Sequence, residues 1–223
     1  MTVRIEKIDA ANPDSLILEQ AAKLIAKGEV LVCPTDTGYA FSVNALDSKA
    51  VAKVFSLKGR AYSNPMHVAV SSIEEARKYA HINEAARHLA RRFLPGALTL
   101  VLPKKETIPD ILVARRDTIG IRIPDNKVIL SLTKMTAQPL TTTSANISGK
   151  PTPYSADEIV EGMGEAINTV ALILDQGRLA GRELSTVVDL SVSPPQLIRH
   201  GRVSWLDIRE ELKGLRSFDE YFT

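Results

Sequence analysis

Several short apolar runs in this sequence are followed by polar residues that could bind a ligand or take part in a reaction. In chain order these are Thr35-Asp36-Thr37, Lys58-Gly59-Arg60, Arg122, Ser144 with Asn146, Ser185, and Arg199. Hydroxyls, amides, arginine and lysine with few carboxylates suit an anionic ligand, because guanidinium and ammonium groups neutralise phosphate or carboxylate oxygens. The sequence therefore predicts a site for a ligand that carries phosphate or carboxylate groups.

The motifs of familiar catalytic centres are missing from the sequence. It has no Gly-x-Ser-x-Gly elbow, no His-Glu-x-x-His zinc motif and no Gly-x-x-x-x-Gly-Lys-Ser/Thr phosphate loop. The four histidines, at positions 67, 81, 88 and 200, do not have metal-ligand spacing. The candidate chemistry therefore rests on the polar clusters and not on a known catalytic motif.

Taken singly, each polar cluster has an ordinary structural explanation. Thr35-Asp36-Thr37 is typical of a capped turn, and Lys58-Gly59-Arg60 is typical of the end of a helix. Ser144 and Asn146 resemble common turn residues, and Ser185 begins a run that is typical of a plain strand. These explanations are favoured for each cluster by itself, so the functional hypothesis depends on how the clusters follow one another.

The hydrophobic pattern predicts the elements that must position these residues. Helices are predicted over residues 15–27, 48–58 and 83–93, and two more begin at the capping boxes of Ser72 and Ser155. Strands are predicted over residues 29–33, 66–70, 98–102, 118–123, 140–143, 170–174, 186–190 and 196–199. Helices and strands alternate early and strands cluster late, which indicates an α/β fold with a mixed sheet flanked by helices. The polar clusters then lie at strand ends, where α/β sheets bind ligands.

Composition limits the class of protein. The 223 residues are 44% apolar, and Lys and Arg number 28 against 26 Asp and Glu, a balance that does not indicate a dedicated nucleic-acid binder. The single cysteine, Cys33, excludes an internal disulfide and favours a reducing compartment. No apolar stretch approaches the roughly 20 residues that span a bilayer. We expect a cytoplasmic protein without a membrane segment, with one domain over residues 1–203 and a short helix and tail over residues 204–223.

Seven blocks in a fixed order carry a family resemblance. They are Pro34-Thr35-Asp36-Thr37, Lys58-Gly59-Arg60 with Asn64-Pro65, Pro95-Gly96-Ala97-Leu98-Thr99, Gly120-Ile121-Arg122-Ile123-Pro124, Thr143-Ser144-Ala145-Asn146-Ile147-Ser148-Gly149, Ser185-Thr186-Val187-Val188-Asp189, and Arg199-His200-Gly201. This series closely resembles the YrdC/TsaC family of threonylcarbamoyl-AMP synthases, from about residue 15 to residue 203. The Lys-x-Arg and Ser-x-Asn elements are its most specific parts. The resemblance implies a YrdC-like α/β fold, in which a twisted mixed parallel/antiparallel sheet is flanked by helices and a deep, positively charged cavity holds the substrates.

By this resemblance, we expect the protein to make threonylcarbamoyl-AMP and pyrophosphate from L-threonine, bicarbonate and ATP. The product is the activated intermediate used to modify the adenosine next to the anticodon of certain tRNAs. A Mg²⁺ ion is expected with the ATP, without assigned protein ligands. A downstream threonylcarbamoyl-transfer complex is expected as a partner, because the synthase alone makes only the adenylate.

The resemblance also implies a role for each matched residue. Thr35 and Arg122 are expected to bind threonine. Lys58 and Arg60 are expected to be catalytic, since they would meet the nucleotide phosphates and the carboxylated amine. The expected ATP-binding residues are Lys58, Arg60, Ser144, Asn146, Ser185 and Arg199.

Some residues depart from the pattern of the synthases and favour a related branch of the family. Gly38-Tyr39-Ala40 and Thr118-Ile119-Gly120 are closer to YciO, a related branch, whereas the Lys-x-Arg and Ser-Ala-Asn elements favour the synthases. Arg60 is followed by Ala61 where the family usually has proline. A strand histidine of some relatives aligns with Ala69, and His67 lies two residues earlier, on the same face of the predicted strand.

Two further hypotheses belong to other functional classes. The first is a YrdC-like module that binds double-stranded RNA or the ribosome without adenylation, through Arg87, Arg91, Arg92, Arg115 and Arg116. Solvated faces of a helix and a loop are the simpler explanation of these charges. The second is carbamoyl transfer, as in hydrogenase-maturation proteins, and it is disfavoured because the zinc-finger and acylphosphatase segments of those proteins are absent from this sequence.

Overall fold

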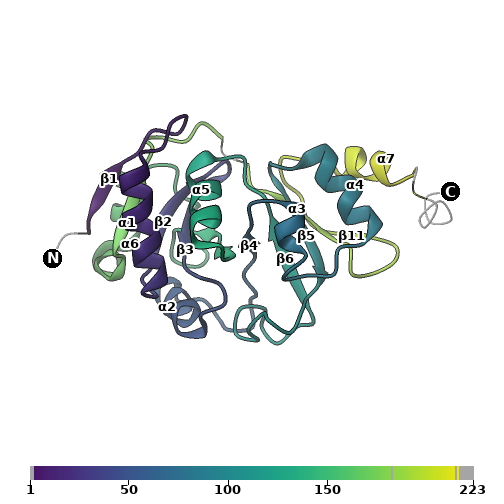
Figure 1. Cartoon of the computed structure of the whole chain (residues 1–223), viewed down its shortest axis with the longest axis horizontal. Coiled ribbons are helices and arrows are strands. Elements are labelled where there is room, and N and C mark those ends of the chain that lie inside the picture. Colours follow the sequence, from purple (N-terminus) through teal and green to yellow (C-terminus); the bar gives the residue numbers. More distant parts are fainter. Residues whose placement is uncertain (1–2, 182, 214, 216–223) are drawn as a thin grey trace.

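The strands of this computed structural model form two mixed sheets (Figure 1), and the structure describes residues 3–181, 183–213 and 215. The first sheet has the order β1-β9-β2-β3-β8, and the second has the order β11-β10-β5-β6-β4-β7. The strands of the first sheet are β1 (Ile5–Lys7), β2 (Leu31–Thr35), β3 (Gly38–Ser42), β8 (Thr143–Ser144) and β9 (Leu172–Asp175). Those of the second are β4 (Val68–Ala69), β5 (Leu98–Pro103), β6 (Thr118–Arg122), β7 (Leu140–Thr141), β10 (Thr186–Asp189) and β11 (Gln196–Arg199). Both sheets contain parallel and antiparallel pairs, which confirms the predicted class, although the prediction placed all strands in one sheet.

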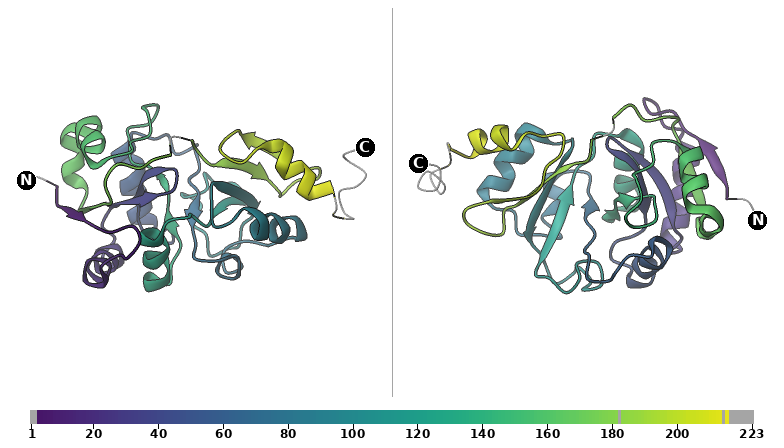
Figure 2. Two further views of the ribbon diagram at one scale, coloured as in Figure 1. Left: turned by 90° about the horizontal axis from the view of Figure 1, so that it is seen from above. Right: turned by 180° about the vertical axis from the view of Figure 1, so that it is seen from behind.

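Helices cover both faces of the first sheet (Figure 2). One face packs on α1 (Ser15–Ala26) and α5 (Lys127–Thr136), and the other packs on α2 (Ser48–Lys58) and α6 (Ala156–Met163), which continues into the 3₁₀-helix η1 (Gly164–Thr169). Leu31 and Cys33 of β2 belong to the apolar cluster with α1 and α5, whereas Val32 belongs to the cluster with α2 and α6. A strand buried on both faces needs an unbroken apolar run, and β2 has one.

The second sheet carries its helices on one face. These are α3 (Ile73–Ala76), α4 (Glu84–Phe93) and α7 (Trp205–Lys213) (Figure 1). Leu98, Leu100 and Leu102 of β5 belong to the apolar core that these helices join, so the alternating Thr99 faces the opposite way. This opposite face is therefore available for polar residues.

Helix α7 packs against α4. Glu211 of α7 accepts a hydrogen bond from Arg92 at 3.1 Å and lies 3.0 Å from Nε2 of His88. The predicted domain boundary at residue 203 stays a prediction. Residues 214 and 216–223, the rest of the predicted tail, lie outside the described residues.

The serine N-caps of the two predicted capping boxes are confirmed. The hydroxyl of Ser72 accepts from the amide of Glu75 at 3.1 Å, and that of Ser155 accepts from the amide of Glu158 at 3.3 Å. Each hydroxyl pairs one of the amides that a helix N-terminus leaves without a partner.

Strands β1 and β3, helix α5 and the 3₁₀-helix η1 are missing from the sequence prediction. Helix α5 was not predicted because two of its first three residues, Val128 and Ile129, are β-branched. Its N-cap Asn126, which accepts from the amide of Val128 at 3.0 Å, is a common turn residue. Strand β3 was not predicted because Gly38 and Ala40 are weak strand formers. It pairs antiparallel with β2, from Thr35 opposite Gly38 to Leu31 opposite Ser42.

None of the helices in the described part of the chain is long and apolar enough to cross a membrane. Cys33 is buried in β2 as a free thiol. Burial raises the pKa of this thiol to about 12, so it is protonated and packs as a small apolar group.

The chain passes from the second sheet to the first between residues 140 and 144. Strand β7 pairs with β4 in the second sheet, and β8 pairs with β3 in the first, so Thr142 lies between the two sheets. The amide of Thr142 donates to the carbonyl of His67 at 3.2 Å. The polar ends of several strands meet around this crossing point.

Candidate active site between the two sheets

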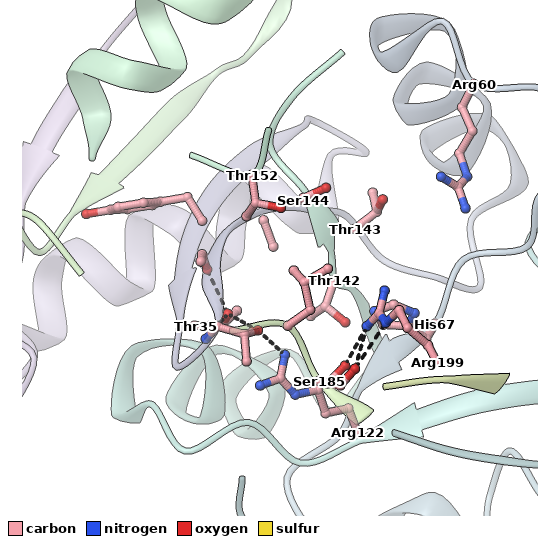
Figure 3. Close-up of a pocket in the computed structure, with 15 residues that line it drawn as sticks. Thr35, Arg60, His67, Arg122, Thr142, Thr143, Ser144, Thr152, Ser185 and Arg199 are labelled. Carbon is pink, nitrogen blue, oxygen red and sulfur yellow. Dashed lines mark hydrogen bonds between the residues drawn. The ribbon is translucent and has the colours of Figure 1, made fainter. Parts of the chain in front are cut away.

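A pocket of about 140 Å³ opens where the chain passes from β7 to β8 (Figure 3). Arginine, histidine and hydroxyl side chains dominate its wall, and none of the described residues that line it is acidic. The lining residues are Thr35, Thr37, Gly38, Tyr39, Ala40, Arg60, His67, Arg122, Thr142, Thr143, Ser144, Thr152, Leu184, Ser185 and Arg199. The wall therefore suits an anionic ligand. The depth of the cavity implied by the family resemblance stays a prediction.

The β2–β3 turn forms one side of the pocket. The hydroxyl of Thr35 donates to the carbonyl of Gly38 at 2.7 Å, so this hydroxyl already has a partner within the turn. Gly38 has a φ of 140°, and a Cβ atom there would lie 2.6 Å from Cγ2 of Thr152. Glycine at position 38 thus lets the segment around Thr152 approach the turn. This close approach accounts for the glycine in the Gly38-Tyr39-Ala40 sequence, which departs from the usual sequence of the synthases.

Arg122 lies at the end of β6 and is almost completely buried. Its Nη2 donates to a carboxylate oxygen of Asp36 at 2.6 Å, and its Nη1 donates to the hydroxyl of Thr37 at 2.5 Å. Burial lowers the pKa of Arg122, and the charge of Asp36 opposes that effect. Asp36 was predicted only as a turn residue, and the structure shows that it balances the charge of Arg122.

Arg199 and Ser185 come from neighbouring strands and bind each other. The Nη2 of Arg199 donates to the carbonyl of Ser185 at 2.8 Å and to its hydroxyl at 2.9 Å, and the same hydroxyl lies 3.0 Å from Oγ1 of Thr99. A Cβ atom at Gly201 would lie 2.4 Å from the carbonyl oxygen of Leu184, so only glycine permits this close approach of the two chain segments. The Nη1 group of Arg199 makes no hydrogen bond to the described residues, so it is free to bind a ligand in the pocket.

Arg60 enters the pocket from the loop after α2. Gly59 ends that helix in the left-handed conformation, with a φ of 56°. The guanidinium of Arg60 is held through Nε to the carbonyl of Asn64 at 3.0 Å and through Nη2 to the carbonyl of Pro65 at 2.9 Å. Its Nη1 group has no hydrogen bond to the described residues and can bind an anion.

Lys58 does not line the pocket, although the family resemblance implies that it binds phosphate. The side chain is buried, and its ammonium donates to the carbonyl of Ser144, to the carbonyl of Asn146 at 2.8 Å and to Oδ1 of Asn146 at 3.0 Å. An ammonium has three N–H donors, so all of them are used. Burial, and secondarily the charge of Arg60, lower the pKa of Lys58 to about 7, whereas its three oxygen partners favour the charged form.

Asn146 also lies behind the pocket wall. Its Oδ1 accepts from the hydroxyl of Ser144 at 2.6 Å, and its Nδ2 donates to the carbonyl of Lys150. Lys58 and Asn146 thus fix the turn that presents Ser144 to the pocket. Their expected contacts with ATP stay predictions.

The structure brings together most of the residues expected from the sequence. Thr35, Arg60, Arg122, Ser144, Ser185 and Arg199 line one pocket. The sequence analysis assigned no role in the site to Thr37, Thr142 or Thr152, and it treated His67 mainly as a strand residue. The signal for its place was the strand histidine of some relatives, which aligns two residues away with Ala69, on the same face of the predicted strand.

No protein ligands were assigned to the expected Mg²⁺ ion. The described residues contain no group of three or more His, Cys, Asp and Glu side chains that could hold an ion. The Mg²⁺ ion expected with the ATP stays a prediction.

Comparison with known proteins shows the family of this chain. A family model described as "Telomere recombination", which covers Sua5, YciO and YrdC proteins, matches residues 23–201. The chain belongs to this family. As a member of the Sua5/YciO/YrdC family, it is 42% identical over 185 residues to a Methanocaldococcus jannaschii protein named putative threonylcarbamoyl-AMP synthase, covering 83% of this chain and 86% of the relative. It is also 38% identical over 197 residues to the threonylcarbamoyl-AMP synthase of Pyrococcus abyssi, covering 88% of this chain and 57% of that relative.

A solved structure of the Sua5/YciO/YrdC family has the same fold. The crystal structure of P. abyssi Sua5 complexed with L-threonine superposes with a TM-score of 0.87 at 35% identity, over 95% of this chain and 61% of that chain. The present chain thus spans somewhat more than half the length of the P. abyssi proteins.

Proposed function

We propose that this protein makes threonylcarbamoyl-AMP and pyrophosphate from L-threonine, bicarbonate and ATP. The observation that carries the proposal is the pocket at the sheet crossing, where Arg60, Arg122 and Arg199 converge and no acidic lining residue opposes them. Bicarbonate, the carboxylate of threonine and the phosphates of ATP are all anions, so one cationic pocket can gather them.

The names of similar proteins support the same reaction. Relatives with 38–42% identity carry the name threonylcarbamoyl-AMP synthase, and a structure with a TM-score of 0.87 contains L-threonine. Threonine is therefore the best-supported substrate. Because the chain spans only part of the P. abyssi proteins, the complete activity is a proposal here.

The chemistry needs positioning and charge neutralisation more than an enzyme nucleophile. The amine of threonine is carboxylated to a carbamate, and a carbamate oxygen then attacks the α-phosphorus of ATP and expels pyrophosphate. Both nucleophiles belong to the substrates, which agrees with the absence of a known catalytic motif from the sequence. Guanidinium groups fixed in the pocket wall would stabilise the charge that develops at phosphorus.

Two arginines have the free donors that this step requires. The Nη1 groups of Arg60 and Arg199 make no hydrogen bonds to the described residues, and the other nitrogens of both side chains are held by backbone or serine oxygens. We assign Arg60 to the phosphates of MgATP and Arg199 to an anionic oxygen of the reacting substrates. Arg122 is balanced by Asp36 and has two N–H groups left, so we assign it to the carboxylate of threonine, together with the nearby Thr35.

The role of the protein in tRNA modification follows from the proposed product, threonylcarbamoyl-AMP. Threonylcarbamoyl-AMP is an activated acyl group, so a separate transfer complex must deliver it to the tRNA adenosine next to the anticodon. We place this reaction in the cytoplasm, in keeping with the free, buried thiol of Cys33.

The test measures pyrophosphate release by the purified protein with ATP, magnesium and bicarbonate, with and without L-threonine. Threonine-dependent release together with the mass of threonylcarbamoyl-AMP is the expected result. No release with any combination of these substrates would overturn the proposal and favour a YciO-like protein without this activity. RNA affinity that falls steeply with salt would then support the RNA-binding hypothesis, and turnover with carbamoyl phosphate in place of threonine and bicarbonate would support carbamoyl transfer.

A further inference from the structure

One corner of the pocket, formed by Thr142 and His67, contains polar groups that the protein leaves without a full set of partners. The hydroxyl of Thr142 is one of two buried side-chain polar atoms in the described residues that make no hydrogen bond. Thr142 is only 5% exposed and lines the pocket, whereas the other unpaired hydroxyl, that of Ser42, belongs to a fully buried residue that does not line it. A buried hydroxyl without a partner costs stability, so its persistence in a pocket wall points to a ligand that supplies the missing hydrogen bond.

His67 is the second polar group of this corner. Its imidazole lines the pocket and forms a hydrogen bond with the backbone of Thr142, and its own carbonyl accepts the amide of Thr142 at 3.2 Å, so one ring nitrogen is left facing the pocket for a ligand. Gly120 of β6 lies directly against it, and a Cβ atom there would come within 2.8 Å of Cβ of His67. The backbone thus holds His67 and Thr142 together and leaves room for the imidazole at the wall.

The charges around His67 keep its ring neutral. Burial and the guanidinium groups of Arg199, Arg122 and Arg60 lower the pKa of His67 to about 3. No carboxylate in the lining opposes them, and Asp36, beside the lining residue Thr37, is paired with Arg122. A neutral imidazole offers one N–H donor and one nitrogen acceptor. The corner therefore combines the free donors of Arg199 and Arg60 with two groups that can accept a hydrogen bond.

This combination suits a small anion that carries its own O–H group. Carboxylates, and phosphate esters in their fully ionised form, offer only acceptors and would leave the acceptor nitrogen of His67 unpaired. An ammonium group would be repelled by the guanidinium groups that surround the ring. Bicarbonate has negatively charged oxygens for the arginines and one O–H for the imidazole or the hydroxyl.

We propose that His67, Thr142 and the free face of Arg199 form the binding site for bicarbonate, an inference that rests on the proposed function. In the carboxylation step the neutral amine of threonine attacks the carbon of bicarbonate and a C–N bond forms. The C–OH bond breaks, and the hydroxide leaves with one amine proton as water, which gives the carbamate anion. A hydrogen bond from the bicarbonate O–H to His67 or Thr142 orients the C–O bond that must break.

The first test compares Thr142→Val with Thr133→Val in bicarbonate-depleted buffer. Valine keeps the shape of Thr142 but removes its hydroxyl, so KM for bicarbonate should rise about tenfold, as expected for loss of one buried hydrogen bond. KM for threonine and for ATP should change less than about twofold, because Thr142 is assigned to neither substrate. Thr133, a buried threonine of α5 whose hydroxyl bonds within its own helix, is the matched control and should leave all three values unchanged.

Stability gives a second readout of the same variant. Because the hydroxyl of Thr142 has no protein partner, Thr142→Val should keep or raise the melting temperature of the ligand-free protein. A threonine that served only the fold would show the opposite result, with a lowered melting temperature and unchanged KM for bicarbonate. That pair of results would overturn the proposal.

His67 is tested by a pair of variants. His67→Gln keeps an acceptor and a donor on the side chain, so its KM for bicarbonate should stay within a few-fold of the wild type. His67→Leu removes both and should raise that KM by about tenfold or more. Equal effects of the two variants, or a rise confined to KM for ATP or for threonine, would show that the corner serves another group.

Binding without turnover separates this proposal from the proposed function. Line broadening of ¹³C-bicarbonate by the protein is measured in the absence of threonine and ATP, and it should be lost in Thr142→Val and His67→Leu but not in Thr133→Val. If the wild type releases threonine-dependent pyrophosphate but these variants broaden the signal as the wild type does, the bicarbonate site is wrong and the function stands. If broadening is specific but no threonylcarbamoyl-AMP forms, the proposed function fails.

Discussion

The ammonium of Lys58 lies 2.8 Å from the carbonyl oxygen of Asn146 and 3.0 Å from its side-chain oxygen. The carbonyl of Lys58 in turn accepts the amide of Ser148 at 2.9 Å. The end of α2 and the turn after β8 are thus joined by side chain and backbone, and the Lys-x-Arg and Ser-x-Asn elements form one structural unit. Arg60 and Ser144 are the members of this unit that line the pocket.

Replacing Lys58 by methionine should therefore damage the fold as well as the reaction. Three buried oxygens lose their donor, and we expect the free energy of unfolding to fall by about 2–3 kcal/mol. Urea unfolding measures this change, with Lys49→Met, an exposed lysine of the same helix, as a control that changes stability by less than about 0.5 kcal/mol. Unchanged stability with a rise only in KM for ATP would instead make Lys58 a direct ligand of the nucleotide.

Arg60→Ala should affect the reaction without affecting the fold. The guanidinium binds only the carbonyls of its own loop, so its loss should leave the melting temperature nearly unchanged. We expect kcat/KM to fall by about 100-fold, the typical effect of removing one fixed donor from a developing oxyanion. Arg77→Ala removes an exposed arginine outside the pocket and should keep full activity. Full activity of Arg60→Ala would remove the residue from the site.

Asp36→Asn should destabilise the protein because it leaves the buried guanidinium of Arg122 without its counter-charge. Breaking one side of a buried ion pair costs about 3–5 kcal/mol. The pair of Asp110 and Lys104, 3.3 Å apart, offers a comparison in which the carboxylate is exposed, and Asp110→Asn should cost no more than about 1 kcal/mol. Equal, small losses of the free energy of unfolding for both variants, measured with urea, would show that the buried charge of Arg122 does not need Asp36 as its counter-charge.

The low pKa of His67 makes stability depend on pH in a defined window. Between pH 3 and 6.5 the imidazole binds a proton in the unfolded chain but not in the folded protein, so acid favours unfolding over this range. The free energy of unfolding should thus rise with pH more steeply in the wild type than in His67→Gln, by up to about 1.4 kcal/mol per pH unit. Urea unfolding from pH 4 to pH 6 measures both slopes. His81→Gln, an exposed control, should keep the slope of the wild type, and identical slopes for all three proteins would contradict the prediction.

Gly120→Ala should displace His67 from its place at the pocket wall. The added methyl would meet Cβ of His67 at 2.8 Å and Cγ2 of Thr99 at 3.2 Å, and such overpacking costs about 1–3 kcal/mol. Gly162→Ala is the matched control, because the methyl added there meets no atom within 4 Å and should stabilise α6 by up to about 1 kcal/mol. Circular dichroism on heating would show opposite shifts in melting temperature, and a neutral Gly120→Ala would mean that His67 moves freely.

Much of the fold is predictable from local patterns. The capping boxes at Ser72 and Ser155 and the apolar run of β2 depend on neighbours a few residues away, and each was identified from the sequence. The pattern does not distinguish α5 from a strand, because Val128 and Ile129 favour extended backbone by themselves. Packing of α5 against α1 and β2 overrides that preference, and local sequence does not contain this information.

The sequence by itself determined which groups are available for chemistry: clustered hydroxyls, amides and basic residues after short strands, in an order that identifies the family. Only the tertiary structure decided which of them face a ligand. Left-handed Gly59 separates Lys58 from Arg60, so one side chain is buried in a turn and the other enters the pocket. The pairing of Arg122 with Asp36 and the unpaired hydroxyl of Thr142 depend on how two sheets meet, since contacts between residues far apart in the chain are set by strand order and register.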